Sequence, residues 1–359
     1  MLGTPRTPAS GGPLRVAVVG AGAFGRNHLR VYRELQSAGY PVELAAVIDP
    51  NESARTAAAA EYGVRGFATI EACMAWSARE PEVGLAQIKA ASVCVPTMHH
   101  SACARALMAC GVDLLIEKPL AASVADADEI VRLERELGRI VQVGHLERFN
   151  PAVGAARELL NRPMFFEVHR LSVFTPRSLD VDVVLDLMIH DLDIVMSFVD
   201  SPVREVRAVG LPVLSAKVDI ANVRLEFENG CIANFTASRV STERVRKMRF
   251  FQPHQYLSLD FARQDLLMID VTAAAGMEPA QLAAMANASA LGGHPTAGLS
   301  LRKVPVEPDE PLQLEIAAFL EAVQKRSEPV VTAEDGRAAL ALALEINSAV
   351  ASHARRTGL

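Results

Sequence analysis

A short glycine run between a strand and a helix limits the fold of this chain more than any other feature. Leu14–Val19 (LRVAVV) has the length and the largely apolar composition of a buried strand, and Phe24–Ser37 has the pattern of a helix. Between them lies Gly20-Ala21-Gly22-Ala23-Phe24-Gly25. In such a unit the first glycine permits a tight turn, the second lets a ligand approach the backbone, and the third lets the helix pack closely on the strand. The alternative is a glycine-rich turn without a ligand.

Short apolar runs and helical segments continue to alternate up to residue 143. The predicted strands are Leu14–Val19, Val42–Ile48, Ala91–Val95, Asp113–Ile116 and Ile140–Val143, and the later helices are Glu71–Arg79, Ser101–Cys110 and Val124–Leu137. Strands that alternate with helices in this way form a parallel sheet with helices on both faces. We therefore predict an α/β Rossmann domain, a doubly wound parallel sheet, over residues 14–146.

Asp49 ends the second predicted strand, 24 residues after Gly25. A carboxylate at this place can accept hydrogen bonds from the adenosine ribose of a dinucleotide whose pyrophosphate lies at the N-terminus of the first helix. The same carboxylate repels a 2′-phosphate, so the sequence predicts NAD rather than NADP as cofactor. A simple turn at Asp49-Pro50 is the structural alternative.

The pattern changes after His145, where longer runs of period two appear. Ala221–Phe227 and Cys231–Ala237 are joined by Glu228-Asn229-Gly230, and Asn-Gly is a strong hairpin signal. The other predicted elements are the strands Phe165–Phe174, Gln255–Phe261 and Leu266–Val271, the helices Pro151–Leu160, Val183–Phe198, Leu312–Lys325 and Ala333–Ala354, and a partly irregular excursion over Thr272–Pro311. Residues 147–359 are expected to form an α+β domain with an open, mostly antiparallel sheet, whose last helix can pack on the first domain.

Composition excludes several classes of function. A chain of 359 residues, 50% hydrophobic and 22% charged, suits two globular domains. The formal net charge of −6 and the lack of a dense basic run argue against a nucleic-acid partner. The most basic segment, Arg239–Arg249, is better explained as a charged strand face with its turn. No uncharged apolar run has the length of a membrane span, so no membrane partner is expected.

Cysteine usage and the first residues indicate a cytoplasmic protein. The five cysteines show no Cys-x-x-Cys spacing, and four of them lie in apolar, alanine-rich segments. This predicts buried thiols in a reducing compartment and no metal site. Residues 1–13 lack the apolar core of a signal peptide and are expected to be a flexible tail.

Several spaced motifs resemble a known family. Pro96-Thr97-Met98-His99-His100 is followed by Ala106-Leu107, Gly111 and Glu117-Lys118-Pro119, and Asp186 precedes His190 by four residues. With the glycine loop, and over the chain from Leu14 onward, this order resembles the glucose–fructose oxidoreductase/inositol dehydrogenase (Gfo/Idh/MocA) family. The resemblance implies an NAD-dependent sugar dehydrogenase in which Lys118 lies between nicotinamide and substrate. The cofactor-binding residues indicated by the loop and the resemblance are Gly20, Gly22, Ala23, Phe24, Gly25, Asp49, Pro96, Thr97, His100, Glu117 and Lys118.

The residue types fit this chemistry. Positions i and i+4 share a helical face, so Asp186 can orient His190, and such a pair can carry a proton near neutral pH. Lys118 can hold a substrate oxygen and stabilise its developing alkoxide charge. We therefore predict Lys118, Asp186 and His190 as catalytic residues, on facing walls of a cleft between the two halves of the chain. Without the family order, a solvated lysine and a structural histidine would be the simpler explanations. The weaker candidates, each with a structural explanation, are His99, Asp191 and Asp193.

One stretch narrows the subgroup. Gly144-His145-Leu146-Glu147-Arg148-Phe149-Asn150-Pro151, with Arg177 and Asp182–Asp193, resembles bacterial members that act on nucleotide sugars, the UDP-N-acetylglucosamine 3-dehydrogenases. Those members supply a 3-keto sugar to a pyridoxal-phosphate aminotransferase in the synthesis of amide-linked lipid A. A diphosphate needs cations or helix N-termini. The substrate-binding residues thus implied are Lys118, Arg148, Asn150, Arg177 and His190, with Arg239 as a further available cation. The link Pro81–Lys89 is longer than the family pattern, a departure that leaves the cofactor site intact.

Other functions stay open beside the oxidation of C3 of UDP-N-acetylglucosamine. A dehydrogenase or reductase of a free sugar or of a cyclitol such as inositol would need no cations at the far end of the cleft. A cofactor-sensing regulatory protein on the same fold is disfavoured because Lys118, Asp186 and His190 are all present. A sheet with one uncovered face usually binds a partner, so we expect a homodimer or homotetramer.

Overall fold

The computed structural model describes residues 12–83, 85–175, 181–271, 277, 278, 280, 281 and 300–358. The chain divides into two compact units, of which unit 1 comprises Met1–Phe149 and Glu310–Ala341, and unit 2 comprises Asn150–Asp309 and Leu342–Leu359. The sequence placed the boundary between residues 146 and 147 and assigned everything after it to the second domain. In the structure the stretch Glu310–Ala341 instead belongs to unit 1.

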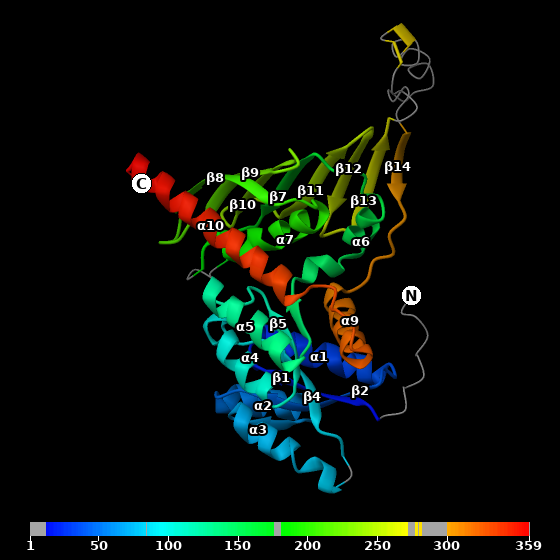
Figure 1. Cartoon of the computed structure of the whole chain (residues 1–359), viewed down its shortest axis with the longest axis vertical. Helices are drawn as coiled ribbons and strands as arrows, with labels where there is room; N and C mark the ends of the chain where they lie inside the picture. Colours follow the sequence, from blue (N-terminus) through cyan, green and yellow to red (C-terminus); the bar gives the residue numbers. More distant parts are fainter. Residues whose placement is uncertain are drawn as a thin grey trace. The chain divides into compact units, whose positions relative to one another are not determined.

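Unit 1 is built on a six-stranded sheet with the order β3-β2-β1-β4-β5-β6 (Figure 1). The strands, all paired in parallel, are β1 (Leu14–Val19), β2 (Val42–Ile48), β3 (Arg65–Phe67), β4 (Ile88–Val93), β5 (Asp113–Glu117) and β6 (Val141–Gly144). The helices are α1 (Ala23–Ser37), α2 (Glu52–Tyr62), α3 (Ile70–Ser77), α4 (His100–Ala109), α5 (Val124–Leu137) and α9 (Pro311–Lys325), with 3-10 turns η1 (Glu80–Val83), η2 (Thr97–His99) and η3 (Leu146–Phe149). The predicted doubly wound architecture is confirmed.

Helix α9 joins this unit through the hydrophobic core. Ile316 and Phe319 of α9 are buried with Leu29 and Leu35 of α1 and with Leu115 of β5. Burial of each such side chain contributes roughly 1.5–3 kcal/mol, which is enough to hold this distant segment of the chain beside α1. Helices α4 and α5 pack against each other along the other side of the sheet (Figure 1).

Unit 2 contains an eight-stranded sheet with the order β14-β13-β12-β11-β7-β10-β9-β8. The strands are β7 (Phe165–Leu171), β8 (Val203–Leu211), β9 (Ile220–Phe227), β10 (Ile232–Ser238), β11 (Val245–Gln252), β12 (Gln255–Asp260), β13 (Asp265–Asp270) and β14 (Ser300–Val304). Each neighbouring pair is antiparallel apart from β7 and β10, which run parallel. The prediction of a mostly antiparallel sheet is confirmed, and β11 forms from the basic segment that the sequence assigned to a strand.

The helices of unit 2 are α6 (Pro151–Arg157), a π-helical turn η4 (Val184–Met188), α7 (Ile189–Phe198) and the C-terminal part of α10 (Ala333–Thr357). Helices α6 and α7 lie on the same face of the sheet (Figure 1). Alternate side chains such as Val168, Val223 and Phe235 are buried, while their neighbours in sequence are partly or fully exposed. Within the described residues no helix covers the opposite face, which we call the open face.

The structure refines two local predictions. The predicted helix Val183–Phe198 forms, but its first turn, Val184–Met188, is π-helical and α7 follows it. The expectation of buried thiols holds for Cys73 and Cys231, whereas Cys94 and Cys103 are half-buried and Cys110, at the C-cap of α4, is exposed. All five are free thiols. Residues 1–11 of the predicted tail and most of the Thr272–Pro311 excursion lie outside the described residues. Among the described helices, none combines the length and the apolar character that crossing a membrane requires.

Candidate active site

The glycine loop connects β1 to α1 with a geometry that needs glycine for two different reasons. Gly20 has a φ of +101°, and a Cβ there would lie 2.5 Å from the carbonyl oxygen of Cys94. A Cβ on Gly25 would lie 1.8 Å from the carbonyl oxygen of Gly20. A Cβ on Gly22 would meet no protein atom within 4 Å. The fold therefore requires Gly20 and Gly25, whereas Gly22 leaves its backbone open to a ligand.

The N-terminus of α1 opens at this loop. Gly22 is the N-cap and has no side chain to bind the first amide groups of the helix. These amide groups and the positive end of the helix dipole form a site for phosphate oxygens. Phe24, in the first turn, is 56% exposed although it is a large apolar residue, and Met98 after β4 is 74% exposed. Both present apolar surface that a bound cofactor can cover.

Asp49 holds the loop and remains able to bind a ribose. Its Oδ2 accepts a hydrogen bond from the amide of Ala21 at 2.7 Å, and its Oδ1 accepts one from the amide of Asn51 at 2.8 Å. Each carboxylate oxygen has a second lone pair, so two ribose hydroxyls can still donate to it. The residues present thus fit a dinucleotide with a free 2′-hydroxyl.

His100 ties together the turns that follow β4 and β5. Its Nδ1 lies 3.0 Å from the carbonyl oxygen of Pro119, and its Nε2 lies 2.9 Å from that of Val95. Two acceptors favour a charged ring, but burial is the larger effect and lowers the pKa of His100. A neutral, buried imidazole between these two carbonyl oxygens braces the Lys118-Pro119 turn. His99, by contrast, is exposed on η2.

Lys118 follows β5 directly and is half-buried. Pro96 and Thr97 follow β4, the neighbouring strand, so both segments lie at the carboxyl edge of the sheet, where open α/β sheets bind ligands. Glu117, the last residue of β5, places its Oε1 2.8 Å from Nε2 of His28 on α1. His28 belongs to no motif that the sequence displays. Its position four residues before Tyr32, on the buried face of α1, was the available signal.

The predicted proton-transfer pair lies in unit 2. Asp186 is in the π-helical turn η4, and His190 is the second residue of α7; both side chains are half-buried. A π turn is wider than an α turn, and such turns occur frequently at functional sites. Lys118 belongs to unit 1 and His190 to unit 2, so the predicted cleft between them stays a prediction.

Asp191 next to His190 has a structural partner. Its two carboxylate oxygens accept hydrogen bonds from Nε and Nη2 of Arg170 on β7, at 2.8 and 2.7 Å. Both side chains are at most 4% exposed. This bidentate pair fixes the first turn of α7 to the sheet, so Asp191 supports the position of His190. Asp193 is also buried, with 1% of its surface exposed.

The other predicted substrate residues have varied surroundings. Asn150 caps α6 and donates to the carbonyl oxygen of Phe261 at 3.0 Å. The buried Arg148 has its Nη2 3.8 Å from Asp335. Arg239 is buried beside Asp219, at 3.4 Å, and donates to the carbonyl oxygens of Val181 and Val218, which is a structural setting rather than a diphosphate site. Arg177 lies outside the described residues.

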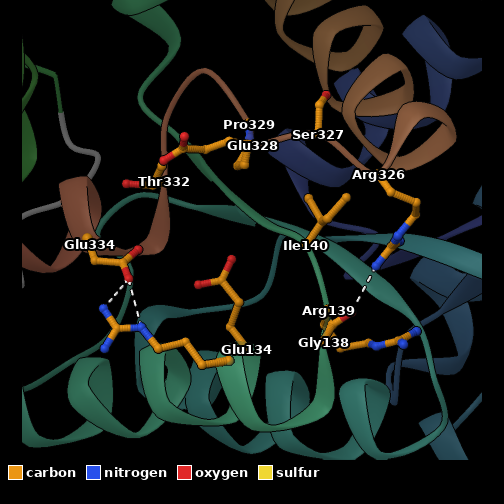
Figure 2. Close-up of a pocket in the computed structure, with 11 residues that line it drawn as sticks. Glu134, Gly138, Arg139, Ile140, Arg326, Ser327, Glu328, Pro329, Thr332 and Glu334 are labelled. Atoms are coloured by element: carbon orange, nitrogen blue, oxygen red, sulfur yellow. Dashed lines mark hydrogen bonds and ion pairs between the residues drawn. The ribbon is translucent and has the colours of Figure 1, made fainter.

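A separate hollow of about 380 Å³ lies in unit 1 between the ends of α5 and α9. In Figure 2 the carboxylate of Glu134 points into it, and Arg326 donates to the carbonyl oxygen of Gly138. The guanidinium of Arg135 donates to the carboxylate of Glu334. Burial is the main cause that raises the pKa of Glu134 to about 7, with the charge of Glu334 as a further cause. This hollow adjoins the amino end of β6, away from the carboxyl edge, so it is not the dinucleotide site.

The fold and the loop together define a class of protein. A parallel six-stranded sheet, an unhindered glycine loop at a helix N-terminus and an acid at the end of β2 are the features of an NAD-dependent oxidoreductase. The family comparisons agree: residues 14–145 match the model described as oxidoreductase family, NAD-binding Rossmann fold, and residues 134–252 match the GFO/IDH/MocA C-terminal domain. The chain belongs to the Gfo/Idh/MocA family of NAD-binding oxidoreductases.

Individual relatives cover either nearly the whole chain or about half of it. The UDP-N-acetylglucosamine 3-dehydrogenase of Acidithiobacillus ferrooxidans is 33% identical over 96% of this chain and 99% of its own length. A solved structure of that enzyme has a TM-score of 0.80 and 31% identity, covering 94% of this chain and 98% of the other. The inositol 2-dehydrogenase of Leifsonia xyli is 30% identical over 54% of this chain and 56% of its own length.

Proposed function

We propose that this protein oxidises the C3 hydroxyl of UDP-N-acetylglucosamine to a 3-keto sugar with NAD. The observation that carries the proposal is the similarity to the A. ferrooxidans enzyme over both units, at 33% identity. The inositol 2-dehydrogenase similarity spans about half of each chain. Because the substrate-binding half of such enzymes selects the sugar, similarity over the whole chain is the stronger argument.

The roles of the residues follow from their chemistry. The bound dinucleotide would supply the hydride acceptor for the hydrogen on C3. His190 takes the proton of the hydroxyl as general base, and Asp186 fixes the tautomer of its ring. Lys118 holds the same oxygen and favours its alkoxide form. The amides of the α1 N-terminus and the carboxylate of Asp49 hold the two ends of the adenosine diphosphate part.

The cellular setting is also part of the proposal. A 3-keto sugar is a substrate for transamination, so a pyridoxal-phosphate aminotransferase that consumes the product, as in amide-linked lipid A synthesis, fits the reaction. Five free thiols suit the reducing cytoplasm. The open face of the unit 2 sheet supports a homodimer or homotetramer.

The test is the rate of NAD reduction against a matched panel. We expect UDP-N-acetylglucosamine to exceed UDP-glucose, free N-acetylglucosamine and myo-inositol in kcat/KM, with NMR of the product locating the carbonyl at C3. A higher kcat/KM for myo-inositol would support the second candidate, a cyclitol dehydrogenase, and would contradict the proposal.

A further inference from the structure

A buried polar layer lies behind the carboxyl end of β5. The register pairs Glu117 with Gly144, which puts Gln142 on the same face of β6, two residues earlier. The carboxylate of Glu117 lies so close to Gly144 that a Cβ there would be 3.1 Å from its Oε2. From the helices that cover this face, His28 of α1 bonds to Glu117, and the side-chain amide of Gln142 donates to the carbonyl oxygen of Glu315 of α9 at 3.0 Å.

Glu315 is the unusual member of this layer. It is 0% exposed, and within the described residues neither of its carboxylate oxygens has a hydrogen-bond partner. It lies on the apolar stripe of α9 that includes Ile316 and Phe319. An ionised carboxylate without donors is very costly in such a place. Burial raises the pKa of Glu315 well above its ordinary value, and the negative charge of Glu117 raises it further.

The groups around Glu315 include the hydrogen-bonded pair of Glu117 and His28. The titratable groups on the elements that contact α9 are Asp113 and Glu117 of β5, Arg26, His28, Arg30, Tyr32, Arg33 and Glu34 of α1, and Glu147 and Arg148 of η3, and Cys94 packs on the same core. Burial raises the pKa of both Tyr32 and Cys94, so these two groups are neutral near pH 7. Arg30 forms its ion pairs at the surface with Glu34 and Glu310.

We propose that Glu315 is a positioning residue for Lys118: as a neutral acid it confines the negative charge of the buried layer to Glu117, directly before Lys118. The pairing of Glu117 with His28 then holds the end of β5 against α1, the helix that begins at the cofactor loop. This inference rests on the proposed role of Lys118. When Glu315 ionises, a second negative charge enters the layer, competes for His28 and disturbs the strand end that carries Lys118.

The first arm of the test measures the proton itself. A carboxyl whose pKa is raised on folding stabilises the folded state least at high pH, because the folded protein must release a proton that the unfolded chain has already lost. Between the two pKa values, the unfolding constant of the wild type relative to Glu315→Gln should therefore rise about tenfold per pH unit. Glu321→Gln, an exposed change on the same helix, is the control and should follow the wild type. Equal pH dependence of wild type and Glu315→Gln would overturn the proposal.

Infrared spectroscopy keeps this arm decisive if Glu315→Gln does not fold, and it uses the Glu134→Gln variant because the carboxyl of Glu134, with its pKa raised to about 7, would also absorb near neutral pH. A buried, protonated carboxyl should absorb at neutral pH and disappear at alkaline pH. Its absence at neutral pH would overturn the proposal.

The second arm measures the effect on the site. We expect the kcat of the wild type to fall on the alkaline side as Glu315 ionises, while the conservative variant Glu315→Gln retains its kcat there and keeps the wild-type KM for NAD. Suppose that the first arm shows Glu315 to be protonated. A pH profile of kcat for Glu315→Gln that is identical to that of the wild type would then overturn the positioning role. A failure of the proposed role of Lys118 can be told apart from a failure of this inference. In that case Lys118→Ala would leave kcat unchanged, while the first arm would still show that Glu315 is protonated.

Discussion

At the scale of single residues, Asp49 should decide between the two nicotinamide cofactors. Its carboxylate is placed to accept from a ribose and to repel a 2′-phosphate. Asp49→Asn retains an oxygen for the amide of Ala21 but loses the charge, so we expect the ratio of NADP to NAD dissociation constants to fall by about tenfold, or ~1.4 kcal/mol. Titration of both cofactors measures it. Equal binding of NAD and NADP by the wild type would contradict the role of Asp49.

Lys118 and His190 should act on the same oxygen. A positioned general base contributes about 10²- to 10⁴-fold in rate, so His190→Ala and Lys118→Ala should each lower kcat by that order while the NAD dissociation constant stays nearly unchanged. The double variant should lose less than the product of the two effects, because residues that act as a unit are not additive. Steady-state kinetics with separate cofactor titrations measure this. A near wild-type kcat of His190→Ala would show that another group is the base.

Residues whose partners are local were predictable from the sequence, and those with distant partners were not. Gly20, Gly25 and Asp49 act within one strand–turn–helix–strand unit, so spacing alone places them. The partner of His28 is 89 positions away, and Glu315 meets β5 only through tertiary packing. Arg239 looked like a candidate diphosphate ligand because a sequence does not show that the fold surrounds it with Asp219 and two carbonyl oxygens.

At the scale of elements, the buried pair of Arg170 and Asp191 should hold α7 on the sheet. Removing one partner of a buried ion pair leaves an uncompensated charge, so Arg170→Met should lower the free energy of unfolding by about 3–5 kcal/mol. The double variant Arg170→Met/Asp191→Leu should recover much of this loss. Urea unfolding measures both. The exposed pair of Arg204 and Glu226 is the matched control, and Arg204→Gln should change stability by less than about 1 kcal/mol. An equal effect of both single changes would contradict the anchoring role.

Elements with a clear period were predictable, and those without one were missed. β3 is three residues long and contains Arg65 and Gly66, so it has no apolar run; its strand pairing comes from β2. The π turn Val184–Met188 has the composition of an ordinary helix. Asp182, just before the π turn, accepts hydrogen bonds from the amides of Val184 and Leu185 and from the side chain of Asn347. The bond to Asn347 joins segments that are far apart in the chain, so the sequence alone does not show it.

At the scale of the whole molecule, Glu134 should make stability depend on pH. Its folded pKa of about 7 lies above its ordinary value of 4.5, so the folded protein holds an extra proton between these values and loses stability as pH rises through this window. Glu134→Gln keeps the acceptor for the amide of Val141, at 3.0 Å, and removes the charge. We expect a gain on the order of 1 kcal/mol at pH 8, reduced by solvent screening, and none at pH 4. Urea unfolding measures this, with Glu243→Gln, a change at an exposed carboxylate away from the hollow, as control. A gain of equal size at both pH values would contradict it.

The open face should bury a second copy of the chain. The strand register aligns one apolar residue from each of six adjacent strands, in the order Ile232, Phe165, Phe251, Tyr256, Ile269 and Leu301. The ring centroid of Phe251 lies 5.7 Å from that of Phe165 and 5.0 Å from that of Tyr256. Phe251 and Leu301 are 40% and 53% exposed. A continuous apolar row across a sheet is costly to leave in water, and a twofold axis would pair it with itself.

A charge in the middle of that row should therefore dissociate the dimer. Because aromatic residues at the centre of an interface contribute about 2–4 kcal/mol, Phe251→Glu should raise the dimer dissociation constant by at least about 30-fold. Sedimentation velocity over a concentration series measures it. Val330→Glu, a change at an equally exposed apolar residue of unit 1, is the control and should leave the association state unchanged. A wild type that stays monomeric at the highest concentration, or a Phe251→Glu variant that associates as tightly as the wild type, would show that the open face is not the interface.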